Sequence, residues 1–159
     1  MIWLFFPVLL LSIHSYCQSC DISSINVTHN TTHIVNVQWI RALLNYRQSV
    51  SASPPENYPY SRNHAIKMFE TNFGPVSNSR YKYGHIPGAI YSDSDAFENG
   101  CPRWNLLPKE MLINVATEMG ISIDTTVVIY SSSFIHTARL WFILKYIGVV
   151  DVRFLNGML

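Results

Sequence analysis

The chain has 159 residues, of which 48% are hydrophobic and 13% charged, which is enough to bury one ordinary core and suits one globular domain. Its 11 basic and 10 acidic residues give a formal net charge of +1 and are scattered along the chain. This balance gives no support for a nucleic-acid-binding face or for attraction to an acidic membrane surface.

Residues 1–19 have the pattern of a secretory signal peptide. Residues 2–13 (IWLFFPVLLLSI) are almost wholly apolar, and the small residues Ser15, Cys17 and Ser19 follow at a suitable cleavage spacing. About twelve apolar residues are too few to cross a bilayer, so we expect no stable membrane span. Because no Lys or Arg precedes the apolar run, a buried N-terminal strand or a short membrane-associated segment is the alternative.

Residues 20–32 are predicted to be a glycosylated N-terminal segment. Asn26 and Asn30 each open an acceptor sequon, which fits a secreted protein or one in the lumen of the secretory pathway. In that oxidising setting Cys20 and Cys101 would be the only thiols of the mature chain, and the sequence leaves open whether they pair. No His/Cys cluster remains there, so we expect neither a metal nor a cofactor.

The next part of the chain alternates short regular elements with polar segments. Apolar residues at helical spacing predict a helix over residues 35–44, and residues 45–63, which contain three prolines, predict a mobile loop. Residues 65–69 suit a short buried strand, and residues 70–83 read as a polar connector.

The second half predicts an α/β fold. A compact turn (Gly84, His85, Ile86, Pro87, Gly88, Ala89) precedes a short extended segment. We then expect a helix over residues 107–119, a strand over 126–130, a helix over 137–147 and a closing strand over 150–155. Strands separated by helices argue for a mostly parallel sheet with helices on both faces.

An active site is expected in the loop that joins the predicted strand at residues 126–130 to the helix after it. A buried strand that feeds a loop and then a helix brings N–H groups together and commonly presents a nucleophile or an anion cradle. Here the loop consists of Ser131, Ser132, Ser133, Phe134, Ile135 and His136, without a cysteine, an acid or a glycine. A catalytic His136 would need a nucleophile to serve, and no pattern for acyl or phosphoryl chemistry accompanies the serines.

Several of these motifs, in this order, resemble a rhodanese homology domain over residues 33–157. They are the Gly84–Ala89 turn, Leu106-Leu107-Pro108, the strand at residues 127–130, the helix residues Ala138-Arg139-Leu140-Trp141 and the closing segment at residues 152–157. The order and spacing are most similar to the first domain of tandem thiosulfate and 3-mercaptopyruvate sulfurtransferases. Glu70 falls where this family usually has an aspartate.

The resemblance implies sulfur transfer chemistry and also its loss. Active members place a cysteine after the central strand, and its thiolate carries sulfur as a persulfide. That position is Ser131 here, which cannot form a persulfide. Phe134 and His136 stand where a loop glycine and an arginine are common, and both changes disturb an anion cradle.

The first domain of the tandem enzymes is commonly non-catalytic, so the resemblance implies a domain that packs against a catalytic partner. We therefore expect a second rhodanese domain, or another protein, as partner, and we expect residues 158–159 to be a truncated end. A free-standing secreted pseudoenzyme that acts as a protein-interaction module is the alternative. The sequence does not identify the sulfur donor or acceptor.

The remaining aromatic and histidine residues read as structural. His85 is expected to hold its turn by bonding to nearby backbone or to a charged neighbour such as Glu70 or Arg80. Trp39, Trp104, Trp141 and Phe142 are expected in the core or at a domain interface, with the last two anchoring the helix behind the serine loop.

Overall fold

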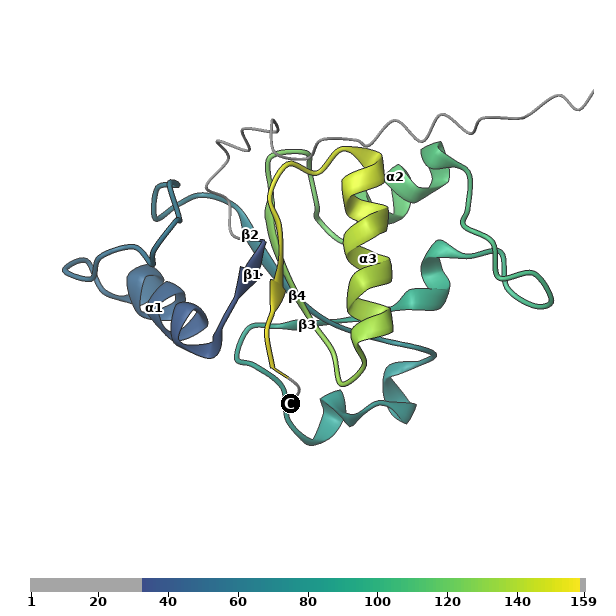
Figure 1. Ribbon diagram of the computed structural model, residues 1–159, viewed down its shortest axis with the longest axis horizontal. Coiled ribbons are helices and arrows are strands. Elements are labelled where there is room, and N and C mark those ends of the chain that lie inside the picture. Colours follow the sequence, from purple (N-terminus) through teal and green to yellow (C-terminus); the bar gives the residue numbers. More distant parts are fainter. Residues whose placement is uncertain (1–32, 158–159) are drawn as a thin grey trace, which may run out of the picture. The chain divides into compact units, whose positions relative to one another are not determined.

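The strands of the computed structural model, which describes residues 33–157, form one parallel sheet. Its order is β1-β5-β4-β2-β3, and all four neighbouring pairs run parallel. Figure 1 shows the central strands with α1 on one side and α3 on the other. The strands are β1 (Ile34–Val35), β2 (Ile66–Asn72), β3 (Ile90–Asp93), β4 (Thr126–Tyr130) and β5 (Val152–Leu155).

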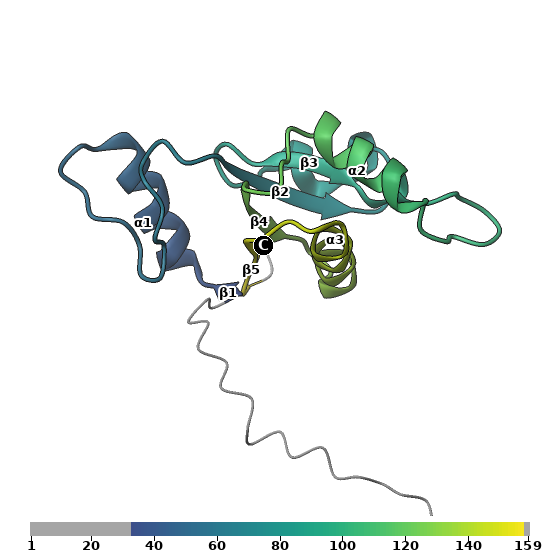
Figure 2. The same ribbon diagram turned by 90° about the horizontal axis from the view of Figure 1, so that it is seen from above.

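Helices cover both faces of the sheet, as predicted. α1 (Val37–Gln48) packs on one face, while α2 (Lys109–Glu118) and α3 (Phe134–Ile147) pack together on the other. Figure 2 shows α1 and α3 on opposite sides of β1 and β5. The predicted α/β class is thus confirmed. Short 3₁₀ helices lie at Val76–Asn78, Arg80–Tyr83 and Ser94–Phe97.

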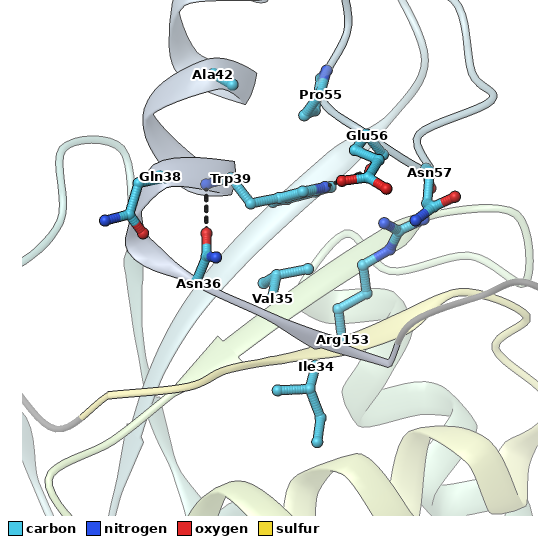
Figure 3. A pocket seen from close by; sticks show the side chains of 10 residues that line it. All are labelled: Ile34, Val35, Asn36, Gln38, Trp39, Ala42, Pro55, Glu56, Asn57 and Arg153. Atoms are coloured by element: carbon cyan, nitrogen blue, oxygen red, sulfur yellow. Dashed lines mark hydrogen bonds between the residues drawn. The ribbon is translucent and has the colours of Figure 1, made fainter.

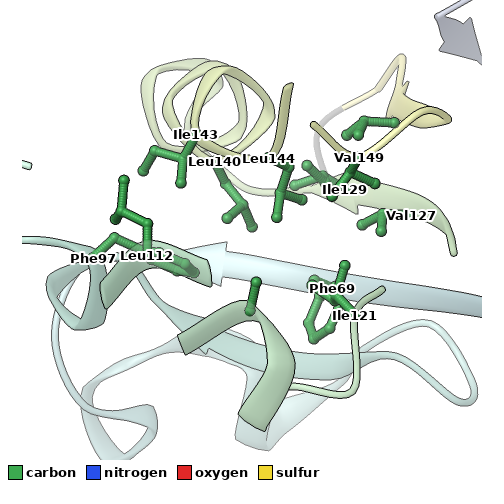
Figure 4. Close-up of a cluster of buried hydrophobic side chains, with 12 residues drawn as sticks. Phe69, Phe97, Leu112, Ile121, Val127, Ile129, Leu140, Ile143, Leu144 and Val149 are labelled. Atoms are coloured by element: carbon green, nitrogen blue, oxygen red, sulfur yellow. The ribbon is translucent and has the colours of Figure 1, made fainter. Parts of the chain in front are cut away.

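The central strand β4 divides its side chains between two cores. All five of its residues are buried. Val127 and Ile129 face α2 and α3, whereas Val128 and Tyr130 face α1, as the alternation of a strand requires. The core on the α3 face also holds Phe69 from β2 and Leu140 from α3 (Figure 4).

A buried ion pair between Arg153 and Asp151 helps to hold α1 and the segment after it on the face of the sheet opposite α3. The Arg153 guanidinium donates from Nε to Asp151 Oδ1 and from Nη2 to Asp151 Oδ2, both at 2.9 Å, and from Nη2 to the Asn57 carbonyl at 3.0 Å. It also lies 4.9 Å from the centre of a Trp39 ring (Figure 3). Trp39, Asn57 and Arg153 also line a hollow of about 360 Å³, so its wall includes groups that help to hold the fold together.

Several element boundaries differ from the sequence prediction. α1 begins at Val37, because Val35 pairs with Leu155 in the sheet, and it runs on to Gln48. Residues 45–48 are therefore helical rather than part of the predicted loop. The rest of that loop has no regular structure, but Arg62 donates to the carbonyls of Tyr46 and Ser49.

The strand β2 extends to Asn72, so residues 70–72 belong to the sheet rather than to the predicted connector. α2 begins at Lys109 with Pro108 as its N-cap, and β5 begins at Val152. α3 ends as predicted at Gly148, whose φ of 107° is a left-handed conformation that favours glycine.

Candidate functional site

The serine loop lies at the point where the sheet changes direction. β2 and β4 are neighbours, but β2 is followed by β3 on one side while β4 is followed by β5 on the other. In open parallel sheets, the crevice at the carboxyl ends of two such strands is where ligands bind. The structure therefore places Ser131, directly after β4, beside Asn72 at the end of β2.

The hydroxyl of Ser131 takes part in a closed hydrogen-bond network. It donates to Asn72 Oδ1 at 3.0 Å and accepts from the Ser133 N–H at 3.0 Å. Ser131 is only 5% exposed, and the Ser132 hydroxyl also donates to Asn72 Oδ1, at 3.3 Å. Neither Asn72 nor Ser133 has an ionisable side chain, so these partners supply no general base for Ser131.

The first turn of α3 replaces the second half of the predicted loop. Phe134, Ile135 and His136 are already helical, so the expected helix start at residue 137 is wrong. Ser133 is extended and serves as the N-cap, although its side chain makes no capping hydrogen bond. Since no glycine interrupts residues 131–136, the helix begins at once and leaves only three serines between β4 and α3.

One N–H group of this short connection is already engaged within the chain. A cradle needs several N–H groups free to point at a ligand. Here the Ser133 N–H is taken by Ser131, and Phe134 and Ile135 extend into solvent, each 73% exposed. His136 lies in the same first turn, and its charge acts on Asp95, lowering a pKa that burial raises.

The predicted turn at Gly84–Ala89 closes over the same end of the sheet. Its Ile86 N–H donates to the Tyr130 hydroxyl at 3.0 Å, which ties the turn to the central strand. Burial raises the pKa of Tyr130 well above its usual range, and neighbouring Glu70 adds to the effect. Gly88 has a φ of 82°, the left-handed conformation that glycine adopts without strain.

His85 holds this turn through backbone rather than through a charged side chain. Its Nδ1 donates to the Tyr81 carbonyl at 3.0 Å, and the two rings stack with centroids 3.9 Å apart. The proposed partners Glu70 and Arg80 are therefore wrong, while the expected backbone contact is confirmed.

Two hollows flank the serines. One, of about 380 Å³, is lined by Glu70, Arg80, Tyr83, Gly84 and Ser132. The other, of about 490 Å³, has a mainly apolar wall and opens beside Ser131. The residues of the apolar wall are Ile34, Phe134, Phe154 and Leu155.

Glu70 and Asn72 belong to the site, although the sequence analysis noted Glu70 only as standing where the family usually has an aspartate. Glu70 is 5% exposed, and its Oε1 accepts from Asn72 Nδ2 at 3.3 Å. The polarity of residues 70–83 predicts a connector at both positions, but a carboxylate and an amide continue the buried strand β2 here. The signal available was their position directly after the apolar residues of β2.

The four aromatic residues expected in the core or at a domain interface differ in how far they are buried. Trp39 is buried, and Trp141 donates from Nε1 to the Val152 carbonyl at 3.1 Å, so both help to hold the fold as expected. Trp104 and Phe142 are 40% and 55% exposed. Phe142 therefore lies outside the core, and its expected place at a domain interface stays a prediction.

The predictions of a signal peptide, of glycans on Asn26 and Asn30 and of a role for Cys20 concern residues outside the described part of the chain. Cys101 is exposed on the loop before α2. Within residues 33–157, no group of three His, Cys, Asp or Glu side chains is placed to hold a metal ion. No helix in that part of the chain is long and apolar enough to cross a membrane.

Comparison with known families agrees with this fold. The rhodanese-like domain model matches residues 69–158, more than half of the chain. The chain therefore belongs to the rhodanese-like domain family. The resemblance inferred from the sequence motifs is confirmed.

Its relatives are named as sulfurtransferases. The chain is 34% identical over 124 residues to the thiosulfate sulfurtransferase YnjE of Escherichia coli K12, which covers 78% of this chain and 26% of the relative. Over 80 residues it is also 34% identical to the 3-mercaptopyruvate sulfurtransferase of the same organism, covering 48% of this chain and 28% of the relative. The chain thus spans little more than a quarter of either relative.

Solved structures give the same result for the fold. The crystal structure of YnjE matches with a TM-score of 0.68 and 32% identity, over 79% of this chain and 27% of YnjE. The anaerobic ergothioneine biosynthesis enzyme of Chlorobium limicola matches with a TM-score of 0.64 and 31% identity, over 79% of this chain and 30% of that enzyme.

Proposed function

We propose that this chain is a non-catalytic rhodanese-like domain of a sulfurtransferase of the thiosulfate or 3-mercaptopyruvate type. The observation that carries the proposal is the Ser131 hydroxyl, which is buried after β4 and bonded to Asn72 and Ser133. A serine hydroxyl cannot carry a sulfane sulfur as a persulfide, because that bond requires a thiolate.

The surroundings of Ser131 support the same conclusion. An active loop would need N–H groups aimed at an anionic sulfur, whereas the Ser133 N–H is bonded internally and the loop is only three residues long. The exposed Phe134 occupies the position where close approach to a substrate would favour a small residue.

The proposed role is to pack beside a second, cysteine-bearing rhodanese domain. This chain covers 26% of YnjE and 28% of the 3-mercaptopyruvate sulfurtransferase, which leaves most of each relative for other domains. The exposed Phe134 and Ile135 at the start of α3 offer an apolar surface for such a partner. The same exposed pair favours the second candidate, a free-standing pseudoenzyme that binds another protein.

We further propose that the chain enters the secretory pathway, on the basis of its leader and two sequons. Expression with the leader in a eukaryotic cell should yield a glycoprotein that shifts on endoglycosidase digestion. The shift should disappear in the double variant Asn26→Gln, Asn30→Gln. An unmodified cytosolic product would refute this part of the proposal.

Sulfur transfer to cyanide tests the proposed lack of catalysis. The full chain should produce no thiocyanate from thiosulfate, and no sulfur transfer from 3-mercaptopyruvate to a thiol, above a heat-treated control. Ser131→Ala provides the matched variant. Turnover by the wild type that disappears in Ser131→Ala would overturn the proposal.

A further inference from the structure

The hollow between Glu70 and Arg80 contains two opposite charges that do not pair with each other. The two ion pairs found within residues 33–157 are Arg139–Glu98 and Arg153–Asp151. Glu70 and Arg80 nevertheless line the same hollow of about 380 Å³, together with Tyr83, Gly84 and Ser132. This volume falls in the range of small-molecule sites.

Glu70 supplies a fixed and largely dry carboxylate on one wall. It is 5% exposed, and its Oε1 is held by the Asn72 amide at 3.3 Å. Its Oε2 is buried and has no hydrogen-bond partner among the described residues. The Tyr130 hydroxyl is a close neighbour of this carboxylate. A ligand in the hollow meets Glu70 only at the 5% of its surface that is exposed, where a donated hydrogen bond offsets the cost of holding a carboxylate away from water.

Arg80 supplies a cation on another wall. It is exposed, and its guanidinium makes no hydrogen bond to any group within residues 33–157. A guanidinium binds a carboxylate through two parallel hydrogen bonds, which makes it selective for that group. Ser132 lines the same hollow, and its hydroxyl can donate a hydrogen bond to a ligand or accept one from it.

We propose that this hollow binds a small zwitterion of the α-amino acid class, with its ammonium group on Glu70 and its carboxylate on Arg80. A lone anion would face the unpaired Glu70 carboxylate, and a lone cation would face Arg80. Only a ligand that carries both charges is attracted to Glu70 and to Arg80 at the same time. This site goes beyond the proposed function, since binding there requires no sulfur transfer and no second domain.

A set of three ligands separates the two charges. L-alanine carries both, ethylamine lacks the carboxylate, and propionate lacks the ammonium group. Titration of the full chain by NMR should shift the amide signals of Glu70, Arg80 and Ser132 with L-alanine. Ethylamine and propionate should each bind at least about tenfold more weakly, because ethylamine cannot bond to Arg80 and propionate cannot bond to Glu70.

Variants of Glu70 and Arg80 test which residue binds which charged group of the ligand. Glu70→Gln and Arg80→Gln should each weaken L-alanine binding about tenfold or more. The exposed residues Glu118 and Arg103 lie outside the hollow, so Glu118→Gln and Arg103→Gln are matched controls that should leave binding unchanged. Arg80→Gln keeps the test decisive if Glu70→Gln fails to fold, because Arg80 is exposed.

Three results would overturn the proposal. L-alanine that causes no shifts would show that the hollow does not take this class of ligand. Propionate that binds as tightly as L-alanine would show an anion site, and ethylamine that does so would show a cation site.

Discussion

Ser131 and Asn72 come from the ends of neighbouring strands and share a hydrogen bond of 3.0 Å. Ser131 also accepts from the backbone of Ser133, so its hydroxyl joins β2, β4 and the start of α3. Ser132 bonds to the same Asn72 oxygen but is exposed to solvent, where water can replace the bond. The two adjacent serines therefore differ in what they contribute to the fold.

Ser131→Ala should lower the free energy of unfolding by about 1 kcal/mol, because it leaves the Ser133 N–H without its partner and weakens the hold on Asn72. Ser132→Ala should change it by less than about 0.5 kcal/mol. Urea unfolding followed by circular dichroism measures both. Equal effects of the two substitutions would contradict the network described for Ser131.

Asp95 links stability to pH. Burial, together with the charges of Asp93 and Glu98, raises the pKa of Asp95 above its ordinary value of 3.8. The folded chain therefore holds this proton more tightly than the unfolded chain, so the stabilising effect of protonated Asp95 is lost as pH rises through its raised pKa.

Asp95→Asn should accordingly be more stable than the wild type at neutral pH, with the difference disappearing as pH falls below 3.8. Asp124→Asn, at an exposed site, is the control and should show no such trend. Unfolding midpoints measured across the acid range test this. A difference that grows toward low pH would have the wrong sign and refute the account.

At the scale of the elements, the N-termini of α1 and α3 differ in how they are capped. Asn36 accepts from the Trp39 N–H at 2.8 Å, whereas the Ser133 side chain caps nothing in α3. Asn36→Ala should therefore cost about 1 kcal/mol of stability, and Ser133→Ala should cost little. Thermal or urea unfolding of the pair decides it, and a larger loss for Ser133→Ala would show that the cap at α3 was misassigned.

The sheet and most elements were predictable because their apolar residues follow regular periods. The strand at 126–130 was predicted with its observed bounds, and Gly148 marked the end of α3. The start of α3 was not predictable from its pattern, since Phe134 and Ile135 are exposed and carry no sign of the buried stripe.

The site was only partly predictable for a similar reason. The place of Ser131 after the central strand followed from the sequence, but its partners did not. Asn72 and Glu70 are separated from Ser131 by about sixty residues of chain, and only the pairing of β2 with β4 brings them together. Arg153 was likewise missed, because a buried guanidinium in a strand depends on Asp151 and Trp39 to be tolerated.

At the scale of the whole molecule, the exposed apolar start of α3 is the surface expected to meet a partner. Phe134 and Ile135 are each 73% exposed, and Phe134 borders the apolar hollow beside Ser131. Clusters of exposed apolar side chains promote association when they are not covered.

The double variant Phe134→Ser, Ile135→Ser should therefore bind less of the dye ANS than the wild type and self-associate less, as measured by fluorescence and light scattering. Phe142→Ser, at a site 55% exposed farther along the same helix, is the matched control and should behave like the wild type. Equal effects of both substitutions would show that the start of α3 is not a specific docking surface.

We propose that no group in the site after β4 can accept sulfur. Mass spectrometry of the full chain after exposure to thiosulfate, followed by digestion, tests it most directly. We predict no gain of a sulfur atom on the peptide that contains residues 127–139, in the wild type or in Ser131→Ala. A sulfur adduct on that peptide in the wild type, absent from Ser131→Ala, would contradict the claim.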